Sequence, residues 1–312
     1  MNHLLSIEDL DRRAIERIVT QAARFAEVSD REIKKVPALR GRMVLNLFYE
    51  ASTRTRSSFE LAAKRLSADV VNFAVSGSSV EKGESLKDTI LTLSAHKPDA
   101  IVLRTPWAGA AELVSRWCSA AIVNAGDGKH EHPTQALLDV YTLRERLGGI
   151  DGASIWIVGD VAHSRVARSN IIAFQRMGAR VTVAGPPTLI PREIDALGCE
   201  VRYTLDELGT ADVVYALRMQ RERMSETSSW VPSLREYASW YQINGRRLSP
   251  RQVLMHPGPV NRGVELSGEV VDSPQAVIAE QVQAGVVVRM AVLYELLSGA
   301  HVPRPVPEPQ LA

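Results

Sequence analysis

Apolar and polar positions along the chain form two kinds of segment that alternate. Short runs that are almost continuously apolar are typical of parallel strands buried on both faces, whereas apolar residues three or four positions apart mark one face of a helix. Patterns of the helical kind follow residues 52 and 85 and separate the apolar runs. This alternation predicts an α/β fold with a parallel sheet. The strand-like runs in the first half cover residues 43–48, 70–75, 100–103 and 120–124.

The first helix is expected close to the N-terminus. Ser6 is a favourable N-cap residue, and Glu8 and Asp9 follow where acidic groups suit the positive end of the helix dipole. Leu10 and Ile18 then fall at helical spacing. The pattern therefore predicts one helix that starts directly after Ser6.

The same rhythm restarts in the second half of the chain. A helix over residues 134–147 is expected to end at Gly148-Gly149, because glycine favours the left-handed conformation of a C-cap. The domain boundary is placed in or near this helix, since further strand-like runs follow it. These runs cover residues 155–158, 180–184, 212–216 and 252–255, and a helix is predicted over 164–177.

The prediction is therefore an α/β protein of two lobes, each a parallel β-sheet flanked by helices. The last helical pattern, residues 276–297, is apolar enough to pack back across the first lobe. The predicted organisation is a first domain, a second domain, a C-terminal helix packed on the first domain and a Pro-rich extended tail. Their boundaries are residues 1–145, 146–285, 286–300 and 301–312.

Composition places the chain among ordinary soluble globular proteins. Its 312 residues are 45% hydrophobic, and a formal net charge of +1 gives no general attraction to nucleic acid or to an anionic membrane. No apolar run is long enough to span a bilayer, and acidic residues come too early at the N-terminus for a signal peptide. We expect a cytoplasmic protein in which Cys118 and Cys199 are buried, reduced thiols.

Polar residues follow the predicted strands repeatedly. In parallel α/β sheets, ligands bind outside the carboxyl ends of the strands, so this recurrence favours one shared cleft over separate coincidences. The residues concerned are Ser52 to Thr55, Arg104, His132, Arg165, Arg218 and Gly258-Pro259.

The segment Ser52-Thr53-Arg54-Thr55 suits a bound oxyanion. Free backbone N–H groups at a helix start, hydroxyl donors and a guanidinium fork together match a phosphate group. The alternative is an ordinary N-cap followed by solvated arginines. His132 and Gln135 flank the start of another predicted helix, where they are placed to polarise a carbonyl, although a histidine in a loop is often only a structural hydrogen-bonding group.

Other kinds of chemistry find little support in the sequence. Gly159-Asp160-Val161 lacks the glycine spacing of a dinucleotide fold, and no phosphate loop ending in Gly-Lys-Ser/Thr is present. No Cys/His cluster suits structural zinc, and no acidic or thiol partner stands out beside His130 and His132, so neither a metal nor a cofactor is predicted. Ser78 and Lys82 lie in a polar loop that is either a surface loop or a lid.

Two longer motifs resemble a known family. Residues 48–60, which read Phe-Tyr-Glu-Ala-Ser-Thr-Arg-Thr-Arg-Ser-Ser-Phe-Glu, are similar to the carbamoyl-phosphate signature of the aspartate/ornithine carbamoyltransferases, and residues 132–139 resemble their second signature. The resemblance covers nearly the whole chain. It implies that residues 1–145 bind carbamoyl phosphate, that residues 146–285 bind the amino acid, and that the active site lies in the interdomain cleft.

Three further segments resemble the aspartate-specific members of the family. They are Lys82-Gly83-Glu84, the run from Arg218 to Arg223, and His256-Pro257-Gly258-Pro259. Some aspartate enzymes carry Leu where this chain has Gly258, which leaves only a backbone contact at that position. The resemblance implies carbamoyl transfer to the α-amino group of L-aspartate, a step of de novo pyrimidine biosynthesis. The alternatives are another amine acceptor such as ornithine, or a non-catalytic homologous scaffold.

The resemblance also implies a role for each candidate residue. The groups expected to hold the phosphate are Ser52, Thr53, Arg54, Thr55 and Arg104. Those expected to face the carbamoyl oxygen are Thr55, Arg104 and His132, and those expected to hold the carbamoyl nitrogen are Gln135 and the backbone near Gly258 and Pro259. Those expected to bind aspartate are Lys82, Arg165, Arg218 and Gln220. Among all these, the catalytic residues are expected to be Arg54, Thr55, Arg104 and His132.

The expected partners are carbamoyl phosphate and L-aspartate, without nucleic acid or membrane. The resemblance implies a homotrimer in which Ser78 and Lys82 reach into the site of a neighbouring subunit. The sequence leaves open whether regulatory or dihydroorotase-like chains assemble on that trimer.

Overall fold

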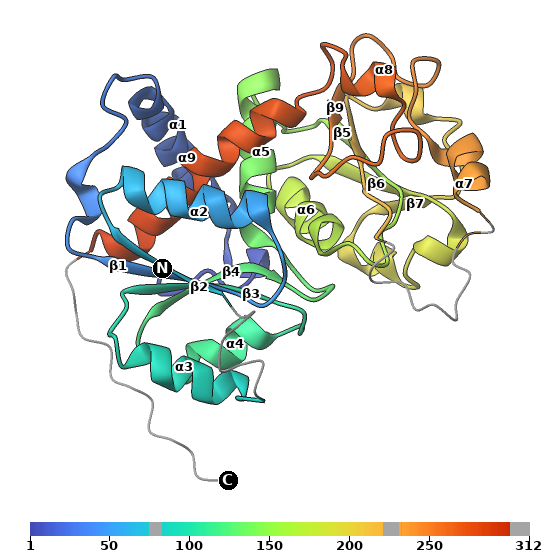
Figure 1. Ribbon diagram of the computed structural model, residues 1–312. Helices are drawn as coiled ribbons and strands as arrows, with labels where there is room; N and C mark the ends of the chain where they lie inside the picture. The colour runs from blue at the N-terminus through green and yellow to red at the C-terminus, as the bar shows by residue number, and fades with distance from the viewer. Residues whose placement is uncertain (75–82, 221–230, 232, 300–312) are drawn as a thin grey trace. The chain divides into compact units, whose positions relative to one another are not determined.

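The computed structural model describes residues 1–74, 83–220, 231 and 233–299 (Figure 1). The chain divides into two compact units: unit 1 is formed by Met1–Leu138 together with Ala284–Ala312, and unit 2 by Asp139–Gln283. The chain therefore passes between the units within α5 (Pro133–Leu147) and again within α9 (Ile278–Leu297). The assignment of one substrate to each part of the chain stays a prediction.

Several candidate positions lie outside the described residues, namely Ser78, Lys82, Arg221 to Arg223 and the tail 301–312.

Within its described residues, unit 1 is built on a four-stranded parallel sheet in the order β2-β1-β3-β4. The strands are β1 (Met43–Phe48), β2 (Asp69–Ala74), β3 (Ala100–Thr105) and β4 (Ala121–Asp127). Helices α1, α2 and α9 cover one face of this sheet, and α3 and α4 cover the other (Figure 1). The helices of unit 1 other than α9 are α1 (Arg12–Ser29), α2 (Thr53–Arg65), α3 (Leu86–Ser94) and α4 (Ala110–Ser115), with short 3-10 turns at Ile7–Asp9 and Pro37–Leu39.

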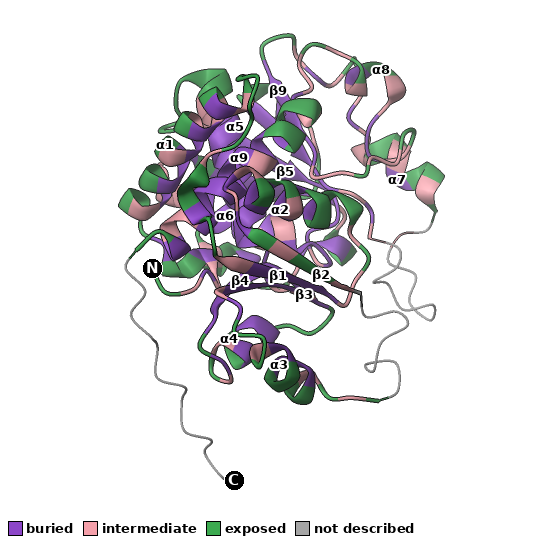
Figure 2. Cartoon of the chain, turned by 60° about the vertical axis from the view of Figure 1, so that its left-hand side comes forward, coloured by how far each residue is buried: buried purple, intermediate pink, exposed green. Residues whose placement is uncertain are grey.

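The central strands of unit 1, β1 and β3, are largely apolar because both of their faces are covered, whereas the edge strand β2 is exposed at Asp69, Val71 and Asn72. Leu45 and Leu47 of β1 belong to a core cluster that also includes Ile90 and Leu93 of α3 and Val114 of α4. Val44, which precedes Leu45, is fully buried as well, and so is the polar Asn46 between Leu45 and Leu47. Figure 2 shows β1 and β3 as mostly buried. The run over residues 43–48 was thus correctly interpreted as a parallel strand buried on both faces.

Unit 2, in the residues that the structure describes, holds a five-stranded parallel sheet in the order β7-β6-β5-β8-β9. Its core gathers Trp156 and Val158 of β5, Val214 of β8 and Leu254 of β9. The strands are β5 (Ser154–Val158), β6 (Arg180–Ala184), β7 (Glu200–Arg202), β8 (Val213–Ala216) and β9 (Val253–Met255). The helices are α6 (Arg165–Arg176), α7 (Leu234–Tyr241) and α8 (Gly268–Val271). The predicted α/β class with two parallel sheets is confirmed.

Each sheet contains a point at which the strand order changes direction. In unit 1 the chain moves from β1 outward to β2 and then returns to place β3 on the other side of β1. In unit 2 it moves from β5 out through β6 and β7, and β8 then lies on the other side of β5. Loops diverge at such a switch point and leave a crevice at the carboxyl ends of the two strands, which is where α/β sheets bind ligands. The topology alone therefore marks the β1/β3 and β5/β8 ends as candidate sites.

The predicted start of the first helix is wrong. Ser6 caps only the 3-10 turn Ile7–Asp9, and Leu10 is extended with φ −103° and ψ 120°. Helix α1 begins later, at Arg12, where the Asp11 side chain accepts a hydrogen bond from the N–H of Ala14. Two capping residues compete within six positions, and burial of Leu10 in extended form separates the two turns.

Smaller differences concern boundaries. Strand β4 runs on to Asp127, three residues beyond the predicted end, and the last helix begins at Ile278. Only Gly148 of the predicted glycine pair has a positive φ, of 77°. Strand β7 was not predicted, because its edge position leaves Glu200 and Arg202 exposed and removes the apolar signal. Cys118 and Cys199 are both buried and free, as predicted.

Candidate functional site

The N-terminus of α2 lies at the exit of β1, on one side of the switch point of unit 1. Ser52 is its N-cap residue, and the Ser52 side chain makes no capping hydrogen bond. The backbone N–H groups of the first helical turn lack intrahelical acceptors, and the turn is at the positive end of the helix dipole. Thr55 is buried, whereas Thr53 and Arg54 are exposed. This turn therefore presents backbone, hydroxyl and guanidinium donors, which is the donor set that an oxyanion requires.

Arg104 lies on the other side of the same switch point. In the sheet it is paired with Phe48, the last residue of β1. Its Nη1 donates to the carbonyl oxygen of Ala125 at 3.3 Å, and its Nε lies 3.3 Å from Oε2 of Glu50. The guanidinium is thus held by a backbone carbonyl of β4 and by a carboxylate just after β1. Glu50, two residues before Ser52, was given no role from the sequence.

His132 and Gln135 stand at the start of α5, after β4. Both side chains are largely buried, and the backbone carbonyl of His132 accepts hydrogen bonds from the N–H groups of Gln135 at 2.9 Å and Ala136 at 3.3 Å. The fixed φ of Pro133 suits the first helical position and sets the direction of the helix. His132 and Gln135 are therefore held by one helical turn at the same sheet edge as Arg104.

Arg165 opens α6 at the exit of β5, in unit 2. The Ser164 side chain caps this helix by accepting from the N–H of Ala167 at 3.1 Å. Arg165 is only 2% exposed, so its guanidinium is ordered by surrounding groups. Gly159, which starts the loop, has φ 124°, and a Cβ atom there would come within 2.9 Å of the hydroxyl oxygen of Tyr237. The loop thus requires glycine at its first position.

Arg218 and Gln220 follow β8, the strand beside β5. The N–H of Gln220 donates to Oδ2 of Asp160 at 3.0 Å, and Oδ1 of Asp160 lies 2.7 Å from Nδ1 of His163. Asp160 is completely buried, so it joins the loop after β5 to the loop after β8. The two arginines, Arg165 and Arg218, therefore flank the switch point of unit 2 on loops that are tied together.

Gly258 and Pro259 follow β9, the neighbour of β8. The N–H of Gly258 donates to Nδ1 of His256 at 2.8 Å, which requires that Nδ1 carries no proton. The proton of the neutral ring is then on Nε2, which lies 3.2 Å from Oε1 of Glu265. Oε1 of Glu265 also accepts from the N–H of Asn261 at 2.6 Å. His256 and Glu265 therefore hold the backbone of this loop by hydrogen bonds. His256 was named from the sequence only as part of a motif, and Glu265 was not named.

The described candidate residues thus gather at one edge in each sheet. In unit 1 these are Ser52, Thr53, Arg54, Thr55, Arg104, His132 and Gln135. In unit 2 these are Arg165, Arg218, Gln220, Gly258 and Pro259. Their individual roles toward a substrate stay predictions.

Among the described residues, no group of three or more His, Cys, Asp or Glu side chains is arranged to hold a metal ion, and no helix has the length and apolar character needed to cross a membrane.

Comparison with protein families matches both halves of the chain. Residues 2–145 match the family described as aspartate/ornithine carbamoyltransferase, carbamoyl-P binding domain, and residues 151–296 match the family described as aspartate/ornithine carbamoyltransferase, Asp/Orn binding domain.

Individual relatives and solved structures agree with these matches. The aspartate carbamoyltransferase catalytic subunit of Salinispora arenicola is 58% identical over 306 residues, covering 96% of this chain and 99% of the relative, and that of Acidothermus cellulolyticus is 55% identical, covering 96% and 93%. The structure of aspartate transcarbamoylase from Trypanosoma cruzi in complex with carbamoyl phosphate and aspartate has a TM-score of 0.84 at 34% identity, covering 95% of this chain and 97% of the other. The catalytic subunit of M. jannaschii aspartate transcarbamoylase has a TM-score of 0.82 at 37% identity, covering 95% and 98%.

Proposed function

Because the chain belongs to the aspartate/ornithine carbamoyltransferase family, we propose that it transfers the carbamoyl group of carbamoyl phosphate to the α-amino group of L-aspartate. The products are N-carbamoyl-L-aspartate and phosphate. One N–C bond forms, one C–O bond breaks, phosphate leaves with the electron pair, and the attacking nitrogen loses a proton. The names of the relatives and the bound ligands of the similar structures support this choice of substrates.

The observation that carries the proposal is the placement of arginines at both switch points. Arg104 with the α2 turn occupies the β1/β3 ends, and Arg165 with Arg218 occupies the β5/β8 ends. The reaction needs two anion-binding regions, one for a phosphate and one for a dicarboxylate. A guanidinium group can bind two oxygens of a phosphate or the two oxygens of a carboxylate. The two sets of donors therefore correspond to the two substrates.

We assign carbamoyl phosphate to the groups of unit 1. Ser52, Thr53, Arg54 and Thr55 bind the phosphoryl oxygens at the helix N-terminus, aided by Arg104. Thr55, Arg104 and His132 donate to the carbamoyl oxygen, on which negative charge develops as the tetrahedral intermediate forms. A preorganised donor at such an oxygen is typically worth about 3 kcal/mol of transition-state stabilisation. Gln135 binds the carbamoyl nitrogen, and the Gly258 and Pro259 backbone is assigned to the same nitrogen.

We assign L-aspartate to the groups of unit 2. Arg165, Arg218 and Gln220 bind its carboxylates and leave the neutral α-amine directed at the carbonyl carbon. Arg165 is buried and Arg218 partly buried, so each has already lost part of its water shell before the substrate arrives. Ornithine would instead present a side-chain ammonium, which two arginines would repel. Orientation of two bound reactants supplies much of the remaining acceleration.

The proposal includes an assembly. We place the chain in a homotrimer in the cytoplasm, acting in pyrimidine biosynthesis, with Ser78 and Lys82 completing the site of a neighbouring subunit and Lys82 contacting aspartate. The similar chains are named catalytic subunits, which supports a multi-chain protein. The mass of the purified protein in solution tests the trimer directly.

The experiment that tests the function is an assay of the purified chain with carbamoyl phosphate and, in parallel, L-aspartate or L-ornithine. We expect carbamoyl-aspartate as the product. Carbamoyl-ornithine instead would retain the phosphate assignment of unit 1 and contradict the role of Arg165 and Arg218. Release of neither product, with folded protein at substrate concentrations of several millimolar, would favour a non-catalytic scaffold.

A further inference from the structure

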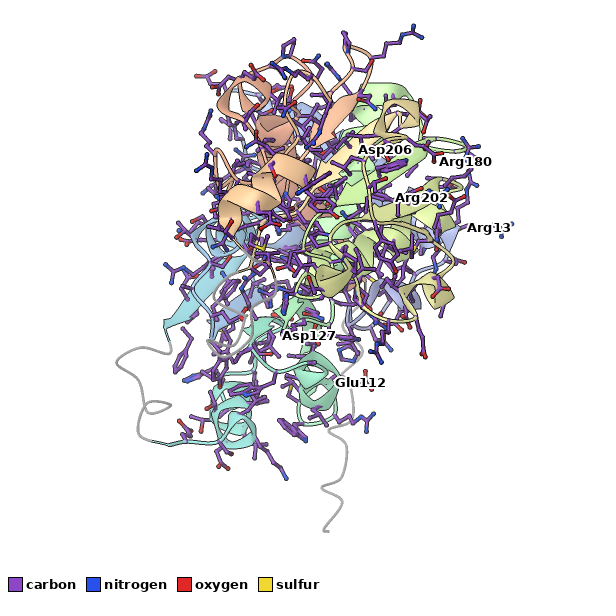
Figure 3. The ribbon with its side chains drawn as sticks, turned by 90° about the vertical axis from the view of Figure 1, so that its right-hand side faces the viewer. Arg13, Glu112, Asp127, Arg180, Arg202 and Asp206 are labelled. Atoms are coloured by element: carbon purple, nitrogen blue, oxygen red, sulfur yellow. The ribbon has the colours of Figure 1, made fainter. Side chains whose placement is uncertain are left out.

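A buried carboxylate lies behind the proposed carbamoyl-phosphate site of unit 1. Asp127 is the last residue of β4 and is 2% exposed (Figure 3). Its Oδ1 accepts from the N–H of Glu131 and from Nδ2 of Asn124, each at 3.0 Å. Its Oδ2 accepts from the N–H of Gly109 at 2.7 Å and lies 2.9 Å from Nδ1 of His130. One side chain therefore contacts several segments at the carboxyl edge of the sheet.

These contacts suit a carboxylate, whose two oxygens both accept. Backbone N–H groups and a side-chain NH₂ are donors only, so both Asp127 oxygens must act as acceptors. The Nδ1 atom of His130 then carries a proton that it donates to Oδ2. Asparagine has almost the same shape, but its NH₂ group would face donors instead of accepting from them. The site thus distinguishes a carboxylate from a carboxamide.

Asp127 joins two loops, one that begins just after the strand carrying Arg104 and one that leads directly to His132. Gly109 ends the loop that begins after Arg104 on β3, and Glu131 immediately precedes His132. The hydrogen bonds to these two N–H groups fix one loop against the other. Gly109 is also the N-cap residue of α4.

Gly128, the residue after Asp127, brings the same two loops into direct contact. The N–H of Gly128 donates to the carbonyl oxygen of Thr105 at 2.9 Å. A Cβ atom at Gly128 would lie 2.9 Å from the carbonyl oxygen of Pro106 and 3.0 Å from the backbone nitrogen of Ala108. Backbone atoms cannot yield as a flexible side chain does. Gly128 therefore fixes the distance between the two loops independently of Asp127.

We propose that Asp127 is a positioning residue, whose carboxylate holds the loop after Arg104 and the loop before His132 in the register that carbamoyl phosphate requires. The inference rests on the proposed function, because it concerns binding of that substrate. Asp127 does not touch the substrate in this account. It acts through the backbone of Glu131 and Gly109.

The test compares Asp127→Asn with a matched carboxylate at the opposite edge of the same sheet. Asp99 accepts from Nη1 of Arg42 and from the N–H of Met43, each at 2.8 Å, before β3 begins. Asp127→Asn should raise the dissociation constant for carbamoyl phosphate at least tenfold and raise its KM similarly. Asp99→Asn should lower the Tm while leaving both constants within about twofold of the unaltered chain. A purely structural role would reduce the active fraction, and so kcat, without changing the KM.

A second variant decides the question if Asp127→Asn does not fold. Gly128→Ala disturbs the same junction through the backbone and should show the same rise in the KM for carbamoyl phosphate. His130→Ala removes one partly exposed donor and should fold with a smaller rise. Normal carbamoyl phosphate affinity in folded Asp127→Asn would overturn the positioning role of Asp127 but not the proposed function. If Asp127→Asn is unfolded, normal affinity in Gly128→Ala would do the same. Lack of carbamoyl phosphate binding by the unaltered chain would overturn the proposed function as well, so the two failures are distinct.

Discussion

Arg289 donates a hydrogen bond from Nη1 to Oγ of Ser58 at 2.8 Å, across 231 positions of sequence. Arg289 belongs to α9 and Ser58 to α2, whose N-terminus forms the proposed phosphate site. The guanidinium carbon also lies 4.9 Å from the centre of the Phe59 ring, and Nη1 reaches the carbonyl oxygen of Gly285 at 3.2 Å. With Arg289 only 4% exposed, the last helix supports the phosphate helix from within the core of unit 1.

Replacing Arg289 with Ala should therefore destabilise unit 1. The change leaves a buried space and removes the partner of the Ser58 hydroxyl, for which we expect a loss of about 2–3 kcal/mol in the free energy of unfolding. Urea denaturation followed by circular dichroism measures it. The control is Arg17→Ala, because Arg17 pairs with Glu295 of the same helix at 3.6 Å but is 60% exposed, and should cost no more than about 0.5 kcal/mol. Equal losses in the two variants would contradict the supporting role of Arg289.

Replacing Arg54 and replacing Arg218 should change different steady-state kinetic constants, because the two residues bind different substrates. Arg54→Ala should reduce kcat/KM for carbamoyl phosphate on the order of a thousandfold, since the arginine binds charge on the leaving phosphate. Arg218→Ala should mainly raise the aspartate KM, by roughly tenfold or more. Arg56→Ala, an exposed arginine in the same turn as Arg54, is the control and should change neither constant by more than about twofold. A normal aspartate KM in Arg218→Ala would remove Arg218 from the aspartate site.

The sequence predicted every described strand except β7, and the positions of the candidate residues, because both depend on local signals. Runs such as residues 43–48 are mostly apolar on both faces. The carboxyl end of a strand lies close in sequence to each of the candidates Ser52, Arg104, Arg165 and Arg218. Carboxyl ends of parallel strands share an edge, so placement along the chain already implies placement in space.

The supporting residues could not be found in the same way because their partners are distant in sequence. Asp127 looks like an ordinary polar residue in a Gly-rich loop until Gly109 is seen against its carboxylate. Arg289 interrupts an apolar helix, and only the fold places Ser58 and Phe59 beside it. The strand order, and with it the switch points, also depends on which strands pair, about which an apolar run carries no information.

Mixing two inactive variants tests whether the site is shared between subunits. Lys82→Ala and His132→Ala should each be inactive alone. A trimer that contains both chains can combine an intact Lys82 with an intact His132 from its neighbour, so random exchange at equal amounts should restore about a quarter of the sites. Activity is measured after subunit exchange under mild denaturant, with each variant treated alone as the control. Proven exchange without recovered activity would argue that each subunit supplies its own Lys82.

Asp139 should be one of the most sensitive positions of unit 2. Its Oδ2 accepts from the Tyr215 hydroxyl at 2.7 Å and from Nδ2 of Asn170 at 2.9 Å, and its Oδ1 accepts from Nε2 of Gln281 at 2.7 Å. Asp139→Asn would set an NH₂ group against donors in a fully buried place, for which we expect a loss of about 3 kcal/mol. Thermal unfolding measures this loss.

The control for Asp139 is a carboxylate of the same unit that is open to solvent. Asp212 accepts from the N–H of Ser154 at 2.8 Å but is exposed, so Asp212→Asn should cost about 1 kcal/mol or less. If Asp139→Asn were no more destabilising than Asp212→Asn, the carboxylate would not be required by its donors, and Asp139 could be neutral in the folded protein.

Tyr237 should make the stability of unit 2 depend on pH in the alkaline range. Burial raises the pKa of the Tyr237 phenol well above its ordinary value, and the nearby charges of Glu265 and Asp160 raise it further. The folded state therefore favours the neutral phenol, whereas the unfolded chain ionises at the ordinary tyrosine pKa of about 10. Below that pH the contribution of Tyr237 is constant, and above it stability falls as the pH rises, since ionisation then favours unfolding.

Tyr237→Phe should remove this part of the alkaline decline. We expect Tm values within a few degrees of the unaltered chain at pH 8, and a shallower fall of Tm between about pH 10 and 11. Tyr203→Phe, which alters an exposed tyrosine of the same unit, is the control and should follow the unaltered chain throughout. If the Tyr237→Phe curve ran parallel to that of the unaltered chain above pH 10, other groups would account for the whole decline. A shallower curve for Tyr237→Phe alone would instead show that one buried phenol, beside the carboxylates that hold the loops after β5, β8 and β9, sets the alkaline limit of unit 2.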